Sequence, residues 1–344
     1  MSNKTAVVIL NWNGEPLMRR YLPSVVANSS APGGVDVVVA DNASTDGSLS
    51  MLRAEFPAVK VIRLDRNYGF AEGYNRAIGQ LANEYVVLLN SDVATAQGWL
   101  EPMVKLMDED ASVGVCGPKL LDDKDHGRFE YAGAAGGFVD WLGYPFCRGR
   151  VMDSVEEDCG QYDTDLDVLW VSGAALMIRR DLYVGAGGLD ADFFAHMEEI
   201  DLCWRLRNMG RRVVACCGRG SKVFHLGGAT LSSANPRKAY LNFRNNLTML
   251  VKNYNGRSWW AVVFMRLVLD GVAGVKYLAE GRAAFCLAIV KAHWGFFGAL
   301  RQTLAKRRLL SQGRGGGLVP EVRPYSMLWR FFALGCKTFS RLEE

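Results

Sequence analysis

The 344-residue sequence lacks several features that would assign it to a common class of protein. Its eight cysteines include no C-x-x-C pair and its four histidines do not cluster with them, so neither a cysteine-ligated zinc site nor a disulfide scaffold is expected. No G-x-G-x-x-G or G-x-x-x-x-G-K-[ST] motif follows the first apolar run, which argues against a Rossmann dinucleotide site and a P-loop. The opening MSNKTAVVIL lacks the pattern of a signal peptide, so we expect the chain to enter its fold directly, in a reducing cytosol.

Charge is unevenly distributed along a chain whose composition is otherwise typical of a folded protein. Hydrophobic residues make up 49% and charged residues 22%, which excludes a disordered chain, and the length suffices for one large domain or two ordinary ones. Residues 231–344 contain 18 Lys and Arg against 5 Asp and Glu, whereas residues 1–230 contain 22 against 31. Because the basic residues lie among apolar, tryptophan-rich stretches, we expect an anionic membrane surface as partner and no nucleic acid.

The first 120 residues alternate between short apolar runs and helical periodicity. Runs of strand length lie at 6–10, 35–40, 59–64 and 85–89. Segments with helical spacing lie at about 15–28, 46–56, 70–81 and 97–110. This alternation predicts an α/β fold with a mostly parallel sheet covered on both faces, and in such sheets ligands bind at the carboxyl ends of the strands.

The segments that follow these strands are polar. They read NWNG at 11–14, DNASTDGS at 41–48, DRNYGF at 65–70 and NSDV at 90–93. Asn, Asp, Gly and Ser also form turns for purely local reasons, so any one segment alone could be only a turn. Four of them on one edge of a sheet favour a shared ligand, and their acids suggest a divalent cation.

Asp92 and His225 are candidate cation ligands, each with a structural alternative. Asp92 follows the fourth strand and could instead cap the next helix. A lone histidine such as His225 is usually structural, but Gly227 and Gly228 directly after it would let the backbone pass close to a bound group.

An acidic cluster at Glu198, Glu199 and Asp201 precedes a predicted helix. Acids in a first helical turn compensate the helix dipole, and this accounts for one or two of them. The preceding Phe193 and Phe194 suit a carboxylate held partly out of water, whose pKa can rise far enough for work as a general base.

These blocks together resemble, in order and spacing, the family 2 glycosyltransferases, especially their rhamnosyltransferase-like branch. The resemblance rests on VVILNWNG at 7–14, DNASTDGS at 41–48, RNYGFAEGYN at 66–75, NSD at 90–92, EEIDLCWRLR at 198–207, VFHLGG at 223–228 and YLNFRN at 240–245. It covers roughly residues 5–255. It implies a GT-A fold, an inverting mechanism, a nucleoside-diphosphate-sugar donor and a divalent cation, Mg²⁺ or Mn²⁺.

The resemblance also assigns roles to individual residues. Donor binding falls to Leu10, Asn11, Asn13, Asp41, Arg66, Asn67, Gly69, Asn75, Asn90 and Arg244. Within this set, Asp41 would bind the nucleobase and Arg244 would contact phosphate. Asp92 and His225 would hold the cation against the diphosphate.

The catalytic assignment falls on the acidic cluster. Glu199 would be the general base with Glu198 supporting it, although many relatives carry Asp at the base position, so the choice between the two stays open. The D-x-D-type motif is N-x-D here, which leaves one firm carboxylate, and Asn90 can act only through its carbonyl or a water.

The remaining segments complete the expected organisation of a GT-A domain over 1–255, with a donor half at 1–120 and an acceptor half at 121–255. Residues 122–168 read as an irregular insertion, either a loop-rich acceptor wall or a solvated excursion, before a core strand within 170–178.

Residues 256–344 read as a basic, apolar helical region. Its apolar stretches at 267–275 and 283–290 are too short to span a membrane, so we expect amphipathic helices lying on the membrane. Tryptophans at headgroup level would be Trp259, Trp260, Trp294 and Trp329, with Lys306, Arg307 and Arg308 on anionic lipid. The alternative is a helical pair that packs on the catalytic domain or on a second subunit.

The expected function is transfer of a sugar from a nucleoside-diphosphate donor, with dTDP-rhamnose one candidate, to a hydroxyl of a lipid-linked or cell-surface glycan precursor. The enzyme would lie in the cytoplasm on the inner face of the cell membrane. One alternative is a sugar nucleotidyltransferase, although the glycine-rich first loop of that class is missing, since only Gly14 follows the first strand. Another is a non-catalytic membrane adaptor on a transferase fold.

Overall fold

The computed structural model describes residues 3–227, 235–256, 258–311 and 317–344. Its central feature is an eight-stranded sheet with the order β12-β14-β6-β13-β4-β1-β2-β3. In that order the strands are Leu166–Asp167, Arg212–Ala215, Val113–Gly117, Ala175–Arg179, Tyr85–Leu89, Thr5–Asn11, Val35–Asp41 and Lys60–Arg63. The four strands predicted in the donor half are therefore confirmed as β1 to β4.

The sheet is parallel on its donor side and mixed in its centre. Strands β4, β1, β2 and β3 run parallel to one another, whereas β13 lies antiparallel between β4 and β6. The sheet therefore has the mostly parallel arrangement that was predicted. The carboxyl ends of β1, β2 and β4 meet at one edge, which brings together the polar loops after them.

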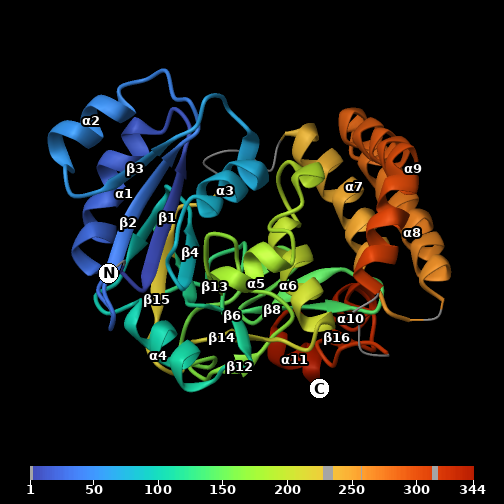
Figure 1. Cartoon of the computed structure of the whole chain (residues 1–344). Coiled ribbons are helices and arrows are strands. Elements are labelled where there is room, and N and C mark those ends of the chain that lie inside the picture. Colours follow the sequence, from blue (N-terminus) through green and yellow to red (C-terminus); the bar gives the residue numbers. More distant parts are fainter. Residues whose placement is uncertain (1–2, 228–234, 257, 312–316) are drawn as a thin grey trace.

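Helices cover both faces of the sheet (Figure 1). The donor-half helices are α1 (Glu15–Asn28), α2 (Ser48–Glu55), α3 (Gly69–Gly79) and α4 (Glu101–Glu109), close to their predicted positions. Alternate residues of β1 point to opposite faces, so Val7 and Ile9 pack with α1 while Ala6 and Val8 pack with α3. This alternation buries both faces of the sheet.

Two smaller sheets flank the central one. The first joins β5 (Val93–Thr95), β15 (Lys222–His225) and β7 (Lys119–Asp122). The second joins β11 (Ser154–Val155), β10 (Arg150–Val151), β9 (Pro145–Cys147), β8 (Gly137–Asp140) and β16 (Val322–Arg323).

Of the two alternatives for residues 122–168, the solvated excursion was wrong, whereas the loop-rich acceptor wall stays a prediction. The segment contains several strands of two to four residues, and its Phe138 and Phe146 are buried in the core. Their glycine-rich context hides the strand pattern, since tight turns separate strands of only two to four residues. Because these side chains lie in the hydrophobic core, the segment is not a solvated excursion.

The C-terminal region contributes to this core as well as forming a helical layer. The helices α7 (Pro236–Asn253), α8 (Trp259–Ala279) and α9 (Ala283–Ser311) lie side by side (Figure 1). After them, β16 pairs with β8, followed by α10 (Met327–Phe332) and α11 (Phe339–Glu343). Phe339 stacks on Phe138 with ring centroids 5.4 Å apart. The domain boundary at 255/256 stays a prediction.

Buried polar contacts fix α8 against the acceptor half. The Arg266 guanidinium lies 3.6 Å from the centroid of the Tyr144 ring and donates to the Leu142 carbonyl at 3.0 Å. Asp270, one helical turn further on, is fully buried 3.4 Å from Arg266. By length and composition alone α9 could also cross a membrane, so the expectation that the apolar stretches are too short was wrong for this continuous helix.

Candidate active site

The loops after β1 and β2 interlock at the donor edge. Asp41 is 1% exposed, and its carboxylate accepts hydrogen bonds from the Asn11 amide at 3.2 Å and from the backbone N–H of Ser44 at 3.1 Å. Asn13 adopts a φ of +52° and its side-chain oxygen accepts from the N–H of Thr45 at 2.7 Å. Three predicted donor residues are thus brought together in one hydrogen-bonded unit.

Asn42 joins this unit to the loop after β3. Its amide donates to the Asn67 side-chain oxygen and to the Gly69 carbonyl, both at 3.0 Å, and its own oxygen accepts from the N–H of Tyr68 at 2.9 Å. Gly69 has a φ of +75°, which favours glycine at this turn. The sequence did not predict Asn42 as a site residue, because asparagine in a turn is expected for purely local reasons.

Arg66 and Leu10 each contact a residue at or near the start of α3. The Arg66 guanidinium stacks over the Tyr68 ring at 4.7 Å from its centroid. A Cβ on Gly73 would lie 2.9 Å from the Leu10 side chain, so the missing side chain lets α3 approach the end of β1. Both predicted residues therefore border the donor edge.

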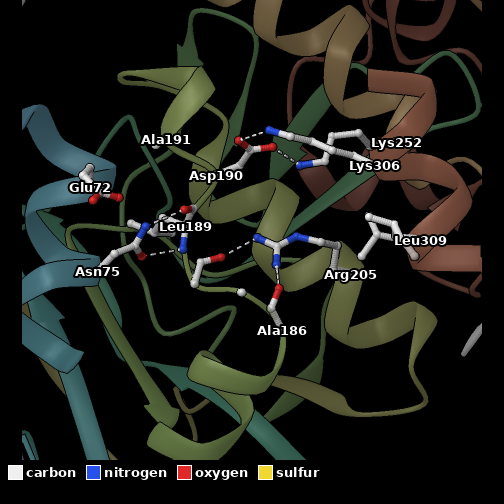
Figure 2. A pocket seen from close by; sticks show the side chains of 13 residues that line it. Glu72, Asn75, Ala186, Leu189, Asp190, Ala191, Arg205, Lys252, Lys306 and Leu309 are labelled. Carbon is white, nitrogen blue, oxygen red and sulfur yellow. Dashed lines mark hydrogen bonds and ion pairs between the residues drawn. The ribbon is translucent and has the colours of Figure 1, made fainter. Parts of the chain in front are cut away.

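Asn75 fastens α3 to the segment before α6 (Figure 2). Its amide donates to the Leu189 carbonyl at 2.8 Å. Its oxygen accepts from the Tyr183 hydroxyl at 2.7 Å and from the N–H of Leu189 at 2.9 Å. Through these hydrogen bonds Asn75 holds α3 against Tyr183 and Leu189. Its contact with a donor stays a prediction.

The small sheet explains how Asp92 and His225 meet. Asp92 directly precedes β5, His225 ends β15, and the antiparallel register pairs His225 with Val93. As a result the His225 Nε2 lies 3.2 Å from the Asp92 Oδ1, and the Asn90 amide lies 3.5 Å from the same nitrogen. Gly228 lies outside the described residues.

Glu130 is a further carboxylate at this site. Its Oε1 lies 3.2 Å from the His225 Nδ1, and the residue is 3% exposed. Burial acts to lower the pKa of His225, but its contacts with Asp92 and Glu130 outweigh burial and raise the pKa to about 10. Glu130 lies within the segment whose strands went unrecognised, and nothing in its spacing pointed to this position.

The donor set fits a divalent cation only in part. A carboxylate oxygen and an imidazole nitrogen, with a second carboxylate on the other ring nitrogen, are the groups that hold and orient metal ligands in proteins. Among the described residues no group of three or more His, Cys, Asp or Glu side chains is placed to hold a metal. Two protein ligands leave positions for diphosphate oxygens, which is the common arrangement for Mg²⁺.

The acidic cluster opens α6 (Glu198–Asn208) after a strained turn. Phe194, His196 and Met197 have positive φ values of 65°, 69° and 74°. Each such conformation costs a non-glycine residue about 1–3 kcal/mol and persists only where the surroundings enforce it. Strain of this kind is concentrated at functional sites.

The two glutamates of this turn are electrostatically unusual. Glu198 is 5% exposed, and the Oε2 atoms of Glu198 and Glu199 are buried with no hydrogen-bond partner among the described residues. Burial raises the pKa of Glu198, and the adjacent Glu199 raises it further. Burial also raises the pKa of Glu199. A carboxylate whose proton affinity is raised in this way is suited to general-base work.

Arg244 and Asn245 of α7 bind the backbone of this turn. The Arg244 guanidinium donates to the Asp192 carbonyl at 2.8 Å and to the Phe193 carbonyl at 3.1 Å. The Asn245 amide donates to carbonyls of the same turn, those of Phe193, Ala195 and His196. The structure thus gives Arg244 a task at the acidic turn, and its contact with phosphate stays a prediction.

Several contacts connect the cation side with the acidic turn. The N–H of Asn90 donates to the Ala174 carbonyl at 3.0 Å, and a Cβ on the adjacent Gly173 would lie 3.4 Å from the Cβ of Glu199. Lys238 interacts electrostatically with Glu130 on one side and with His196 on the other. The loop that contains Gly173 and Ala174 therefore lies between Asn90-Ser91-Asp92 and the two glutamates.

A pocket of about 330 Å³ lies behind the acidic turn, between α3, α6, α7 and α9 (Figure 2). Asp190 sits there between the ammonium groups of Lys252 and Lys306, each at 2.6 Å. Arg205 fills another side and donates to the Gly188 carbonyl at 2.7 Å. The cationic side chains that line this pocket are paired with protein groups. Through Asp190, Lys306 connects the segment before the acidic turn to α9.

The donor half of the chain matches a known protein family. Residues 6–152, which comprise the donor half and β8 to β10, match the family described as Glycosyl transferase family 2. Over 226 residues the chain is 27% identical to the N-acetylglucosaminyl-diphospho-decaprenol L-rhamnosyltransferase of Mycobacterium tuberculosis. That alignment spans 61% of this chain and 72% of the relative.

Two solved structures show the likeness of fold. The mannosyltransferase PcManGT from Pyrobaculum calidifontis, in complex with GDP-Man and Mn²⁺, superposes with a TM-score of 0.53 and 16% identity, covering 91% of this chain and 86% of that one. TarS 1–349 of S. aureus, in complex with UDP-GlcNAc, gives a TM-score of 0.54 at 16% identity, covering 90% and 89%. At such low identity the likeness shows the fold alone. The family match assigns residues 6–152 to the family 2 glycosyltransferases, and the likeness to solved structures shows a GT-A fold for the chain.

Proposed function

We propose that this enzyme moves a sugar, with inversion, from a nucleoside diphosphate to a hydroxyl of a lipid-linked or cell-surface glycan precursor. The observation that carries the proposal is the pair Glu198 and Glu199. Glu198 is buried and Glu199 is half-buried at the start of α6, and neither Oε2 atom has a hydrogen-bond partner among the described residues. The loop after β4 lies across Gly173 from them. A single carboxylate base and one displacement at the sugar C1 invert the anomeric centre, so no covalent nucleophile is required.

Glu199 suits the role of base better than Glu198. Glu198 is 5% exposed, whereas Glu199 is only partly buried and lies beside the side-chain-free Gly173. A base must come within hydrogen-bond distance of the hydroxyl that it deprotonates. The charge of an ionised Glu199 raises the pKa of Glu198, so Glu198 would stay protonated while Glu199 accepts the proton, since two adjacent carboxylates resist joint ionisation.

The donor would lie along the carboxyl edge of β1, β2 and β4. Asp41 and its interlocked loops would hold the nucleoside, and Asp92 with His225 would hold a divalent cation. The related mannosyltransferase structure contains Mn²⁺. When bound, such a cation stabilises the negative charge that develops on the departing diphosphate. Glu130 would keep the His225 ring oriented.

The named relatives narrow the candidate donors and acceptors. The mycobacterial relative is an L-rhamnosyltransferase that acts on a decaprenyl-diphosphate-linked sugar, which supports dTDP-rhamnose as donor and a lipid-linked acceptor here. The related structures hold GDP-mannose or UDP-GlcNAc, so these donors are the informative competitors.

A donor screen of the purified chain tests the proposal. We expect release of nucleoside diphosphate that requires Mg²⁺ or Mn²⁺ and is fastest with dTDP-rhamnose. Pyrophosphate as the product would instead indicate a nucleotidyltransferase. A chain that neither binds nor consumes any of the three donors in the presence of metal would indicate an adaptor and overturn the proposal.

We also propose that α8 and α9 lie on an anionic membrane. Exposed apolar side chains recur at helical spacing on both helices: Trp260, Phe264, Val268, Val272 and Val275, and then Leu287, Val290, Trp294 and Phe297. Exposed basic residues lie beside them: Lys276, Arg282, Lys291, Arg301 and Arg308. This combination of apolar stripe, tryptophan and basic border matches a lipid surface, and it would bring the site to a lipid-linked acceptor.

Vesicle binding tests this surface with two matched valines. Val272 on α8 is 61% exposed and Val184 on α5 (Arg180–Gly185) is 52% exposed. We expect Val272→Glu to weaken binding to phosphatidylglycerol vesicles about tenfold, since a charge in the lipid interface costs more than about 1 kcal/mol. Val184→Glu should bind as the unmodified chain does. Equal binding by all three proteins would contradict the proposal.

A further inference from the structure

Three backbone carbonyls of the acidic turn converge on one side chain of α7. The Asn245 amide nitrogen donates to Phe193 O at 3.0 Å, to Ala195 O at 2.8 Å and to His196 O at 2.8 Å. Asn245 is 1% exposed, so water does not compete for these carbonyls. Carbonyls carry partial negative charge and would repel one another without a shared donor.

The chemistry of the amide explains why asparagine stands here. Two N–H groups on one nitrogen are shared among the three acceptors, while the side-chain oxygen accepts from the Arg244 guanidinium at 2.9 and 2.7 Å. The oxygen therefore faces Arg244 and the nitrogen faces the turn. Aspartate has nearly the same shape but, when ionised, can only accept, so it would turn the three contacts with the carbonyls of the turn into repulsions.

The contacts coincide with the strained part of the turn. Phe194, His196 and Met197, the residues with positive φ, lie within or directly after the clamped backbone, and Glu198 begins α6 at the next residue. Strained conformations persist where surrounding contacts over-determine them. Releasing the clamp would let the turn relax and would change where Glu198 and Glu199 point.

We propose that Asn245 is a positioning residue for the transfer reaction, which holds the turn 193–197 so that Glu199 faces the acceptor hydroxyl. This inference rests on the proposed role of Glu199. Asn245 would act through the turn, with no contact to donor or acceptor. Its loss should therefore reduce turnover while donor binding is kept.

The fold offers a matched control on the next residue. Asn246 is 3% exposed and donates one hydrogen bond, to the Gly143 carbonyl at 2.9 Å, on a different side of α7. Asn246→Asp introduces the same chemical change at a similarly buried position but leaves the acidic turn untouched. Burial of Leu247 and Leu250 in the common core keeps α7 in place in both variants.

The experiment compares Asn245→Asp with Asn246→Asp in the full chain. We expect kcat to fall about 100-fold in Asn245→Asp, because small displacements of a reacting group have effects of this size. The Kd for the nucleotide-sugar donor with Mn²⁺ should stay within about threefold of the unmodified chain, as should kcat of Asn246→Asp.

Folding is controlled by melting temperature and by a second pair of variants. If Asn245→Asp does not fold, Asn245→Ser and Asn246→Ser give the same comparison without an added charge. Equal kcat in the 245 and 246 variants, or loss of donor binding in step with kcat, would overturn the inference. If the unmodified chain is active and Glu199→Gln is not, this result leaves the proposed function intact; an inactive unmodified chain overturns the proposed function itself.

Discussion

Buried polar side chains such as those of Asp41 and Asn42 are hydrogen-bonded at the donor edge, whereas at the acidic turn some buried carboxylate oxygens have no partner among the described residues. At the donor edge, Asp41 accepts two hydrogen bonds and Asn42 makes three, so the loops hold one another before any ligand arrives. At the acidic turn the backbone is clamped but the carboxylates of Glu198 and Glu199 each keep a buried oxygen without a partner in the described structure.

This difference indicates that the donor edge serves ligand binding and that the acidic turn serves the chemical step. Satisfied polar groups cost nothing further when a ligand enters, so the donor edge is preorganised for recognition. Buried carboxylates without partners are costly for folding, and a protein that keeps them gains reactive groups with raised proton affinity. Four substitutions test the division, from the largest expected effect to the smallest.

The largest effect is expected at Glu199. Glu199→Gln keeps the size of the side chain but removes the base, and general-base contributions are typically 10²–10⁴-fold, so kcat should fall about 1,000-fold. Glu198→Gln should cost less than about tenfold by the same measurement, release of nucleoside diphosphate at saturating donor. The reverse order would assign the base to Glu198.

A smaller loss is expected from Asp92→Ala. This variant removes the carboxylate that faces the His225 Nε2 at 3.2 Å, which leaves a single protein ligand for a cation. We expect Mn²⁺ affinity, measured by calorimetry with nucleoside diphosphate present, to drop about 100-fold, as losses at metal sites commonly do. Unchanged Mn²⁺ affinity would place the cation elsewhere.

The donor edge should respond in binding and not in turnover. Asp41→Asn replaces an acceptor of two hydrogen bonds with an amide and should weaken donor binding about tenfold, the equivalent of 1.4 kcal/mol, with kcat little changed. Asp46→Asn is the control, because Asp46 accepts from the N–H groups of Glu15 and Ser48 in the same pair of loops without touching Asp41. A large fall in kcat for Asp41→Asn would erase the contrast between the two regions.

The smallest effect concerns stability and pH. The folded-state pKa of Glu198 is raised, so the carboxyl group favours the folded state when protonated and opposes it as pH rises through that pKa. Glu198→Gln should therefore raise the melting temperature by about 2 °C or more at pH 8, because 1 kcal/mol corresponds to a few degrees in a chain of this size. Near pH 4.5 the gain should vanish. A gain that is equal at both pH values would show that ionisation is not its cause.

The strands and helices of the donor half were predictable because their signals are local. Runs such as 85–89 are apolar throughout, and their length and flanking turns identify them as β4. Helix α1 begins at Glu15 and ends at Asn28 as its periodicity predicts. The polar loops could be placed at one edge because parallel strands present their carboxyl ends together.

The acceptor half was harder to predict because its contacts are non-local. Glu130 meets His225 only through a small sheet whose strands are three or four residues long, too short for a periodic pattern. The pairing of the C-terminal strand was equally hard to predict. Strand β16 pairs with β8 across more than 180 residues, and no local property of Val322 or Arg323 specifies that partner.

The amino-acid sequence by itself determined which residue types follow each strand, where apolar runs and helical stripes occur, and hence the parallel donor sheet with polar residues at its carboxyl edge. Only the tertiary structure decided that Asp92 and His225 face each other, that Asn245 clamps the acidic turn, and that Glu198 and Glu199 each keep an oxygen with no partner in the part of the chain that the structure describes. The physical reason is distance along the chain. Propensity and periodicity act over a few neighbouring residues, whereas hydrogen-bond partners and burial depend on segments that only the completed fold brings together.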